Sequence, residues 1–284
     1  MLIIVGALVV IVGVVVGFLM AGGNLIVLLQ ISEFVTIGGA TTGSLLISAP
    51  VSTIKQIVAA IPKAIKGNHL SKKDYMDLLK SFYDLFLVAQ RDGLLAIEKH
   101  IESPKESDVL SRNDKFVKNE VALTFLCDTL KVMLSGGVPP HEVESLMDTE
   151  IETFEMEQKP VPHLINKVGD ALPGLGIVAA VLGIIVTMGS ITDGAETVGK
   201  HVAAALVGTF LGVLLSYGFV GPLATNIEHQ IEGDVRYLET IKAAVVAYAK
   251  GNPPIVAVEI ARRTIFSESR PSFSELEKFL RGKE

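Results

Sequence analysis

The sequence predicts an all-α integral membrane protein with four transmembrane helices and a helical cytoplasmic part. Residues 171–192 and 202–227 carry no charged side chain. At about 1.5 Å per residue, each stretch is long enough to cross a hydrocarbon core of about 30 Å. The first 54 residues contain one charged side chain, Glu33, and hydrophobic residues make up 49% of the chain. This composition indicates a membrane protein that also has a substantial soluble part.

The first two spans form a hairpin over residues 1–54. No Lys or Arg precedes the apolar run 2–20, and a second apolar run follows it at once. A cleaved signal peptide has a basic start and one short apolar core, so we expect the first span to be retained. Gly22, Gly23 and Asn24 predict the turn between the two spans.

The other two spans form a second hairpin over residues 169–227, joined by the short polar run 193–201. Residues 55–168 are then a cytoplasmic helical domain, and residues 228–284 are a cytoplasmic helical tail. Basic residues set the orientation, because they stay on the cytoplasmic side of short loops. The short connections within the two hairpins contain a single basic residue, Lys200. The basic residues that follow span two and span four are Lys55, Lys63, Lys66, Arg236 and Lys242. Both termini are therefore expected in the cytoplasm.

The soluble parts have helical periodicity. Ser71 and Asp74 have capping-box spacing and begin a helix expected to run to Ser103. Charged side chains recur every seven residues on its polar face, at Asp77, Asp84, Arg91 and Glu98. The further helices are expected at 113–135, from 140 toward the membrane with an interruption at Pro160 and Pro162, and at 231–250, 254–265 and 272–281.

Several kinds of chemistry are not supported by the residues. The net charge is -6 and no basic tract is present, so a nucleic-acid partner is not expected. No Walker-type phosphate loop is present, and Cys127, the single cysteine, excludes an internal disulfide. No Cys and His cluster has metal-ligand spacing. We therefore expect no cofactor, no metal and no enzymatic activity.

Spans three and four are instead rich in small residues. The pairs Gly176 with Ala180 and Gly208 with Gly212 are four residues apart, a spacing that lets membrane helices approach closely. Neither apolar core contains Asp, Glu, Lys, Arg or His. Spans three and four therefore lack the ionisable relay that an intramembrane proton path requires.

Residues 169–183 and 208–224 resemble the third and fourth transmembrane segments of the MotA family, the A subunits of the bacterial flagellar stator, within the MotA/TolQ/ExbB proton channel family. The four-span layout and the cytoplasmic domain match as well, so the resemblance covers nearly the whole chain. It implies a multi-pass protein of the bacterial inner membrane that converts proton flow into torque for swimming and chemotaxis. It also implies five copies around a dimer of the single-span B subunit MotB, whose membrane aspartate carries the ion. The rotor switch protein FliG and membrane lipid are the other implied partners.

The resemblance also implies individual roles. Thr209 matches the fourth-span threonine beside the partner's aspartate. Ala180 lies seven residues after Pro173, where sodium-driven relatives typically have threonine, so the translocated ion is expected to be H⁺. Two further residues are expected along the ion path, Tyr217 and Pro222. On the charged helix, Arg91 and Glu98 are rotor-contact candidates, and either Arg91 or the neighbouring Gln90 makes the first of these contacts.

Each implied role has a simpler structural explanation as an alternative. Pro173 suits the first turn of an apolar helix, where the missing N–H costs nothing. The hydroxyl of a membrane threonine such as Thr209 commonly bonds to a carbonyl one turn back. Charges on an exposed helix face, such as Arg91 and Glu98, usually contribute little. Glu33 is expected near the outer membrane interface, with no role in transport.

Two other functional classes stay open. An energiser of outer-membrane processes, of the ExbB or TolQ type, usually has three spans, so a fourth span argues against it. A self-contained ion channel or transporter needs its own ion site, which spans three and four do not supply. Co-purification with a single-span, aspartate-bearing protein separates the stator from both.

Overall fold

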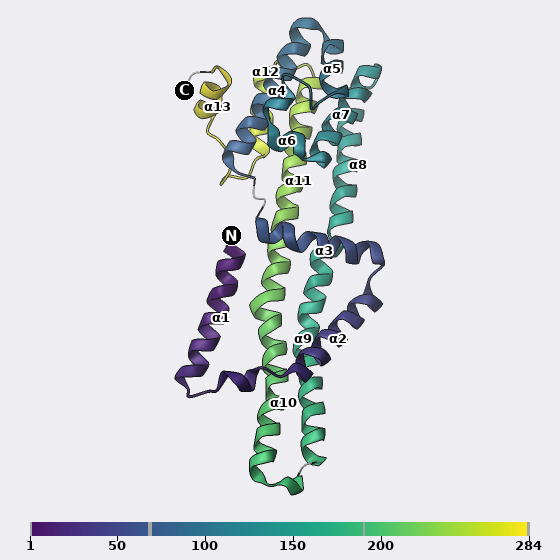
Figure 1. Ribbon diagram of the computed structural model, residues 1–284. Helices are drawn as coiled ribbons and strands as arrows, with labels where there is room; N and C mark the ends of the chain where they lie inside the picture. The colour runs from purple at the N-terminus through teal and green to yellow at the C-terminus, as the bar shows by residue number, and fades with distance from the viewer. Residues whose placement is uncertain (1, 68–69, 190, 283–284) are drawn as a thin grey trace. The chain divides into compact units, whose positions relative to one another are not determined.

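The computed structural model describes residues 2–67, 70–189 and 191–282, and every regular element in these ranges is helical. The chain divides into two compact units (Figure 1). Unit 1 contains Met1–Asn68 and Gln158–Gln230, and unit 2 contains His69–Glu157 and Ile231–Glu284. Four helical stretches among the described residues are long and apolar enough to cross a membrane: Leu2–Met20, Leu25–Ser48, Pro140–Gly189 and Ala195–Ala249.

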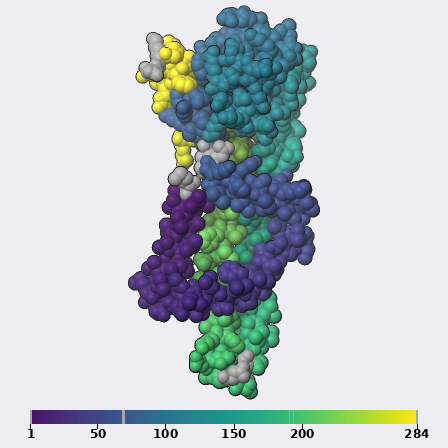
Figure 2. Space-filling view, in the orientation of Figure 1, coloured from purple at the N-terminus to yellow at the C-terminus, as the bar shows by residue number. Residues whose placement is uncertain are grey.

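The first hairpin of unit 1 is made of α1 (Leu2–Met20), η1 (Leu25–Leu28) and α2 (Ile31–Ser48). Helix α1 buries none of its side chains, and its segment (purple) lies on the outside of the unit in Figure 2. Helix α2 ends earlier than the uncharged stretch that predicts it, because Pro50 disfavours helix at Ala49. Residues after Pro50 form a separate helix, α3 (Val51–Lys66).

The second hairpin is made of α9 (Pro160–Gly189) and α10 (Ala195–Leu215), which run antiparallel in Figure 1. The predicted interruption before α9 is confirmed at Lys159, whereas Pro162 falls in the first turn of α9, where proline is tolerated. Pro222 has no N–H to donate, and the helix widens just before it into η5, a π-helical turn at Ser216–Val220. The chain continues as α11 (Gly221–Ala249), so the predicted tail helix at 231–250 is the end of α11 and not a separate element.

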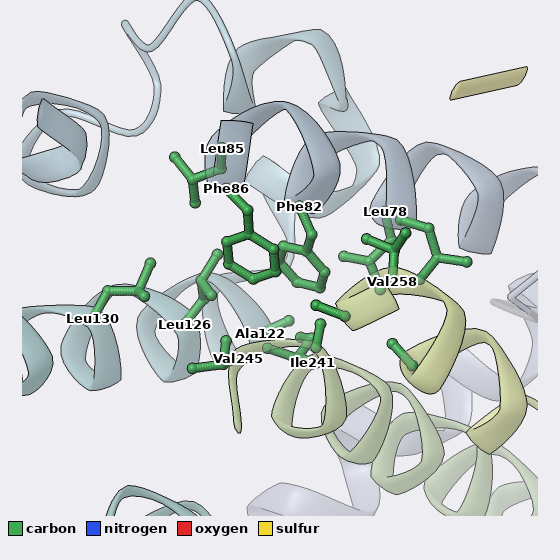
Figure 3. Packing of buried hydrophobic residues seen from close by; sticks show 14 of the residues in the cluster. Leu78, Phe82, Leu85, Phe86, Ala122, Leu126, Leu130, Ile241, Val245 and Val258 are labelled. Carbon is green, nitrogen blue, oxygen red and sulfur yellow. The ribbon is translucent and has the colours of Figure 1, made fainter. Parts of the chain in front are cut away.

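Unit 2 is a helical bundle around one apolar core. Its elements are α4 (Lys72–Asp92), η2 (Leu94–Ile97), α5 (Glu98–Glu102), η3 (Leu110–Arg112), α6 (Asp114–Lys118), α7 (Glu120–Ser135), α8 (Pro140–Gln158), the later part of α11, α12 (Pro254–Thr264) and α13 (Phe273–Leu280). Figure 3 shows Phe82 and Phe86 of α4 facing Leu126 of α7 and Ile241 of α11. Leu78 of α4 lies beside Val258 of α12.

Aromatic and ionic contacts hold this bundle together. Phe86 of α4 stacks on Tyr248 of α11 with ring centroids 4.4 Å apart. Lys250, which directly follows α11, donates to Glu144 of α8 at 2.7 Å. Cys127 is buried in the same core, and burial raises the pKa of its thiol to about 11. The thiol is therefore protonated at neutral pH and weakly reactive.

Two helix predictions for unit 2 are wrong in their length. The helix expected over 71–103 ends at Asp92, because Gly93 has φ +90°, a conformation that side-chain-bearing residues rarely adopt. Glu98 therefore lies on α5 and not on the charged face of α4. The helix expected over 113–135 is divided at Asn119, whose side chain caps α7 by accepting from the Ala122 N–H. The capping box at Ser71 is confirmed, as is the one at Ser272.

Candidate functional site

The two helices of the second hairpin touch backbone to backbone through glycine. A Cβ added to Gly176 of α9 would lie 2.6 Å from the Gly208 carbonyl oxygen and 3.1 Å from the Gly212 Cα. A Cβ on Gly212 would lie 2.5 Å from the Leu172 carbonyl oxygen. Backbone atoms cannot move aside as a flexible side chain can. These positions therefore require glycine, and the small-residue spacing in the sequence correctly predicts close helix packing.

Ala180 and Thr209 lie in the same section of this interface. The Ala180 nitrogen is 3.2 Å from the position of a Cβ on Gly208, and the Thr209 Cα is 3.3 Å from that of a Cβ on Gly176. The Thr209 hydroxyl makes no hydrogen bond within the described part of the chain, whereas the Thr187 hydroxyl donates to the Gly183 carbonyl at 2.8 Å. Thr209 is half-buried, so its hydroxyl is available to a ligand or another chain.

Pro173 lies in the interior of α9, thirteen residues after the helix begins at Pro160, so the simpler first-turn role does not apply. Proline cannot donate to the carbonyl of Gly169, one turn earlier. Tyr217, with 73% of its surface exposed, and the exposed Pro222 are not packed against Thr209. They lie eight and thirteen residues further along, about 12 Å and about 20 Å at the α-helical rise.

Glu33 is a buried carboxylate that the sequence did not connect with this interface. It is 6% exposed and extends from the first turn of α2 to the contact between α9 and α10. Its Oε1 lies 3.8 Å from the position of a Cβ on Gly183, and its Oε2 occupies the space that a Cβ on Gly208 would need. Oε2 has no hydrogen-bond partner among the described residues. No group of three or more His, Cys, Asp or Glu side chains in residues 2–67, 70–189 and 191–282 is placed to hold a metal ion.

The candidate contact residues of unit 2 are exposed, namely Gln90, Arg91 and Glu98. Arg91 is 79% exposed and pairs with Asp92, donating from Nε to Oδ1 at 2.9 Å and from a terminal nitrogen to Oδ2 at 2.7 Å. These hydrogen bonds raise the pKa of Arg91 and lower that of Asp92. Sequence periodicity did not reveal the role of Asp92, because adjacent residues on a helix do not normally face each other.

Two family models match the chain. Residues 4–93 match the model described as Motility protein A N-terminal, and residues 113–240 match that of the MotA/TolQ/ExbB proton channel family. Among curated proteins, Motility protein A of Salmonella typhimurium is 40% identical over 99% of this chain and 96% of its own length. Chemotaxis protein LafT of Vibrio parahaemolyticus is 34% identical over 98% of each chain.

Solved structures show the same fold. The structure of MotAB from C. jejuni matches 95% of this chain and 98% of its own chain, with a TM-score of 0.79 at 20% identity. The flagellar MotAB stator complex from Bacillus subtilis matches 94% of this chain and 97% of its own, with a TM-score of 0.77 at 23% identity. At these identities the likeness shows the fold alone.

Proposed function

This chain belongs to the motility protein A family, a branch of the MotA/TolQ/ExbB proton channel family, and from this membership we infer that it is the A subunit of a flagellar motor stator. With a B subunit it forms a proton channel that turns ion flow into torque on the flagellar rotor. The observation that carries this inference is the 40% identity to a motility protein over 99% of the chain. Four candidate spans also argue against the three-span energiser and for the stator.

We place the protein in the bacterial inner membrane with both termini in the cytoplasm. The orientation rests on the basic residues that follow α2 and η5, among them Lys55 and Arg236. Residues 1–54 and 169–227 are then the membrane hairpins, and residues 55–168 and 228–284 are cytoplasmic. The exposed side chains Gln90, Arg91 and Glu98 are accordingly assigned to the cytoplasm.

The apolar surface of a single chain supports an assembly. Helix α1 buries none of its side chains, and one side of α9 remains exposed through Ile177, Val181 and Ile185. A pentamer around a dimer of MotB, as the family resemblance implies, covers the exposed side of α9 and leaves α1 to the lipid. Helices α9 and α10 line the inside, where their small residues permit close packing, and α1 and α2 face the lipid.

Torque in this proposal comes from ion flow, with no covalent chemistry. One charge that crosses a potential of about 100 mV releases about 2.3 kcal/mol, comparable to a modest conformational step. Protonation of the B-subunit aspartate changes how the ring packs around it. The free Thr209 hydroxyl faces this group, Pro173 provides a flexible point in α9, and Tyr217 and Pro222 line the inner part of the path.

The proposed ion is the proton, and the dependence of swimming on sodium tests this choice. Ala180 offers no ligand oxygen, whereas a hard cation such as sodium is held by several oxygens. Cells that depend on this stator are expected to keep swimming in sodium-free medium and to stop when a protonophore collapses the proton gradient. Swimming speed against sodium concentration measures this. Sodium-dependent swimming would contradict the choice of ion and leave the stator assignment intact.

Charges on α4 and α5 are proposed to contact FliG, with Arg91, or Gln90 beside it, facing an acidic site and Glu98 facing a basic one. Exposed ion pairs are each worth about 0–1 kcal/mol, which suits a contact that is made and broken at every step. Arg91→Glu or Glu98→Lys alone is expected to lower torque partly, and both together to lower it further. Torque is measured on tethered cells.

Lys118→Glu is the matched control for these reversals, since it reverses an exposed charge elsewhere on unit 2. It is expected to leave torque unchanged. Normal torque in the Arg91→Glu, Glu98→Lys double variant at low ionic strength would remove this surface from the rotor contact. Partial recovery with the opposite reversal on the rotor would support it, because Coulombic contacts tolerate changes of geometry.

A further inference from the structure

Glu33 does not perform the usual task of an acidic residue in the first turn of a helix. Gln30 is the N-cap of α2 and Glu33 is the N3 residue, the position from which a glutamate normally accepts a bond from the N-cap N–H. No such cap is formed. The carboxylate instead points away from its own helix and reaches the Gly183 and Gly208 positions of α9 and α10. Helix capping therefore does not explain it.

Packing does not explain Glu33 either. A buried charge is strongly unfavourable unless it is paired and hydrogen-bonded, and in a membrane protein this cost applies with little relief from water. Glu33 is 6% exposed, and its Oε2 has no partner in the described part of the chain. A carboxyl group in this position requires a proton or a cation to neutralise it. The glycine at 208 leaves the space that the carboxylate fills.

A second unpartnered group lies on the same face of α10. His201, Ala205 and Gly208 are spaced by four and three residues, so they share one side of the helix. The Nδ1 of His201 is buried without a hydrogen-bond partner, as is Glu33 Oε2. His201 lies one turn from Ala205, toward the connection with α9, and Thr209 directly follows Gly208. The order along α10 is therefore His201, the Glu33 contact and then Thr209.

Other charged or titratable groups on the elements that pack against α2 are further away along their helices. They are His163, Lys167 and Asp170 on α9, Glu196 and Lys200 on α10, and Lys55, Lys63 and Lys66 on α3. Asp170 precedes Gly183 by thirteen residues, about 20 Å at the helical rise. His201 is therefore the titratable group of these elements that shares the face of α10 contacted by Glu33.

We propose that the Glu33 carboxyl group is a proton-binding station of this chain, in the outer half of the ion path. The proposal rests on the stator function inferred above. A hydronium ion or the His201 imidazolium gives its proton to the carboxylate, forming an O–H bond. That bond breaks as the proton passes, beside the Thr209 hydroxyl, to the carboxylate of the B subunit. Glu33 then returns to its charged form, and no other reactant is consumed.

Proton flow through the complex of this chain and its B subunit tests the proposal. The complex is reconstituted in vesicles with an imposed pH gradient and a pH-sensitive dye inside. Glu33→Gln keeps the size of the side chain but cannot exchange a proton, and it is expected to lower proton flow at least tenfold. Glu33→Asp keeps the carboxyl group and is expected to retain more flow than Glu33→Gln. Co-purification of the B subunit reports assembly of each variant.

Glu196→Gln is the matched control, because it makes the same chemical change at a side chain that is 84% exposed and pairs with Lys200 in the same part of unit 1. It is expected to leave proton flow unchanged. Wild-type flow in the Glu33→Gln complex would overturn the proposal while the stator function stands. An unaltered complex that conducts no protons would instead overturn the stator function itself.

Infrared difference spectra provide a second measurement, one that does not depend on proton flow. Acidification of the unaltered complex is expected to add the carbonyl band of a protonated carboxylic acid to the spectrum. In the Glu33→Asp complex, part of this band is expected to move to a different frequency. A band identical in the two complexes would show that Glu33 does not bind a proton in this range, which overturns the proposal.

Discussion

Gly176→Val is expected to remove nearly all correctly assembled protein from the membrane. Even the first added carbon would lie 2.6 Å from the Gly208 carbonyl oxygen and 3.1 Å from the Gly212 Cα, which are backbone atoms of α10. Overpacking of an interior usually costs about 1–3 kcal/mol. Here the cost is expected at or above the upper end, because the obstacle is a helix backbone. The measurement is the amount of extracted protein and its melting temperature, followed by swimming.

Gly199→Val is the control for this substitution. Gly199 lies near the start of α10, is exposed, and has open space where a Cβ would be added. Gly199→Val makes the same substitution in the same hairpin without a clash against a helix backbone. Stability and swimming are therefore expected to remain close to those of the unaltered protein. Equal stability of the Gly176 and Gly199 variants would mean that α9 and α10 are not held in direct backbone contact.

The parts of this fold that depend on local chemistry could be predicted from the sequence. Apolar length predicts the four spans, and the spacing of Gly176, Gly208 and Gly212 predicts close packing of α9 and α10. The capping boxes at Ser71 and Ser272 predict where α4 and α13 begin. Each of these signals acts within a few helical turns, so no knowledge of the tertiary structure is needed to recognise it.

The features that could not be predicted from the sequence involve residues whose effect depends on a backbone angle or on a contact with a distant part of the chain. Apolar periodicity continues through Gly93, yet this glycine takes a positive φ and ends α4, which separates Glu98 from Arg91. Glu33 is conspicuous as the single charge in the first 54 residues. Its position in the sequence does not reveal that it faces Gly183 and Gly208, which lie 150 and 175 residues later in the chain.

This chain alone is expected to conduct no protons, and conduction is expected to appear when the B subunit is added. Residues 171–189 and 202–227 contain no Asp, Glu, Lys, Arg or His side chain, so these stretches lack the groups that usually relay a proton through a membrane. Glu33 and His201 lie toward one end of the hairpin and cannot complete the path. In the proposed function, the carboxylate that completes it is supplied by the B subunit.

Proton flow into vesicles measures this dependence directly, with three samples compared under the same pH gradient. The chain alone and the complex whose B subunit carries asparagine in place of its membrane aspartate are both predicted to match empty vesicles. The unaltered complex is predicted to exceed them at least tenfold. Proton flow through the chain alone, equal to that of the complex, would contradict the account, because the chain would then be a self-contained channel and not the A subunit of a stator.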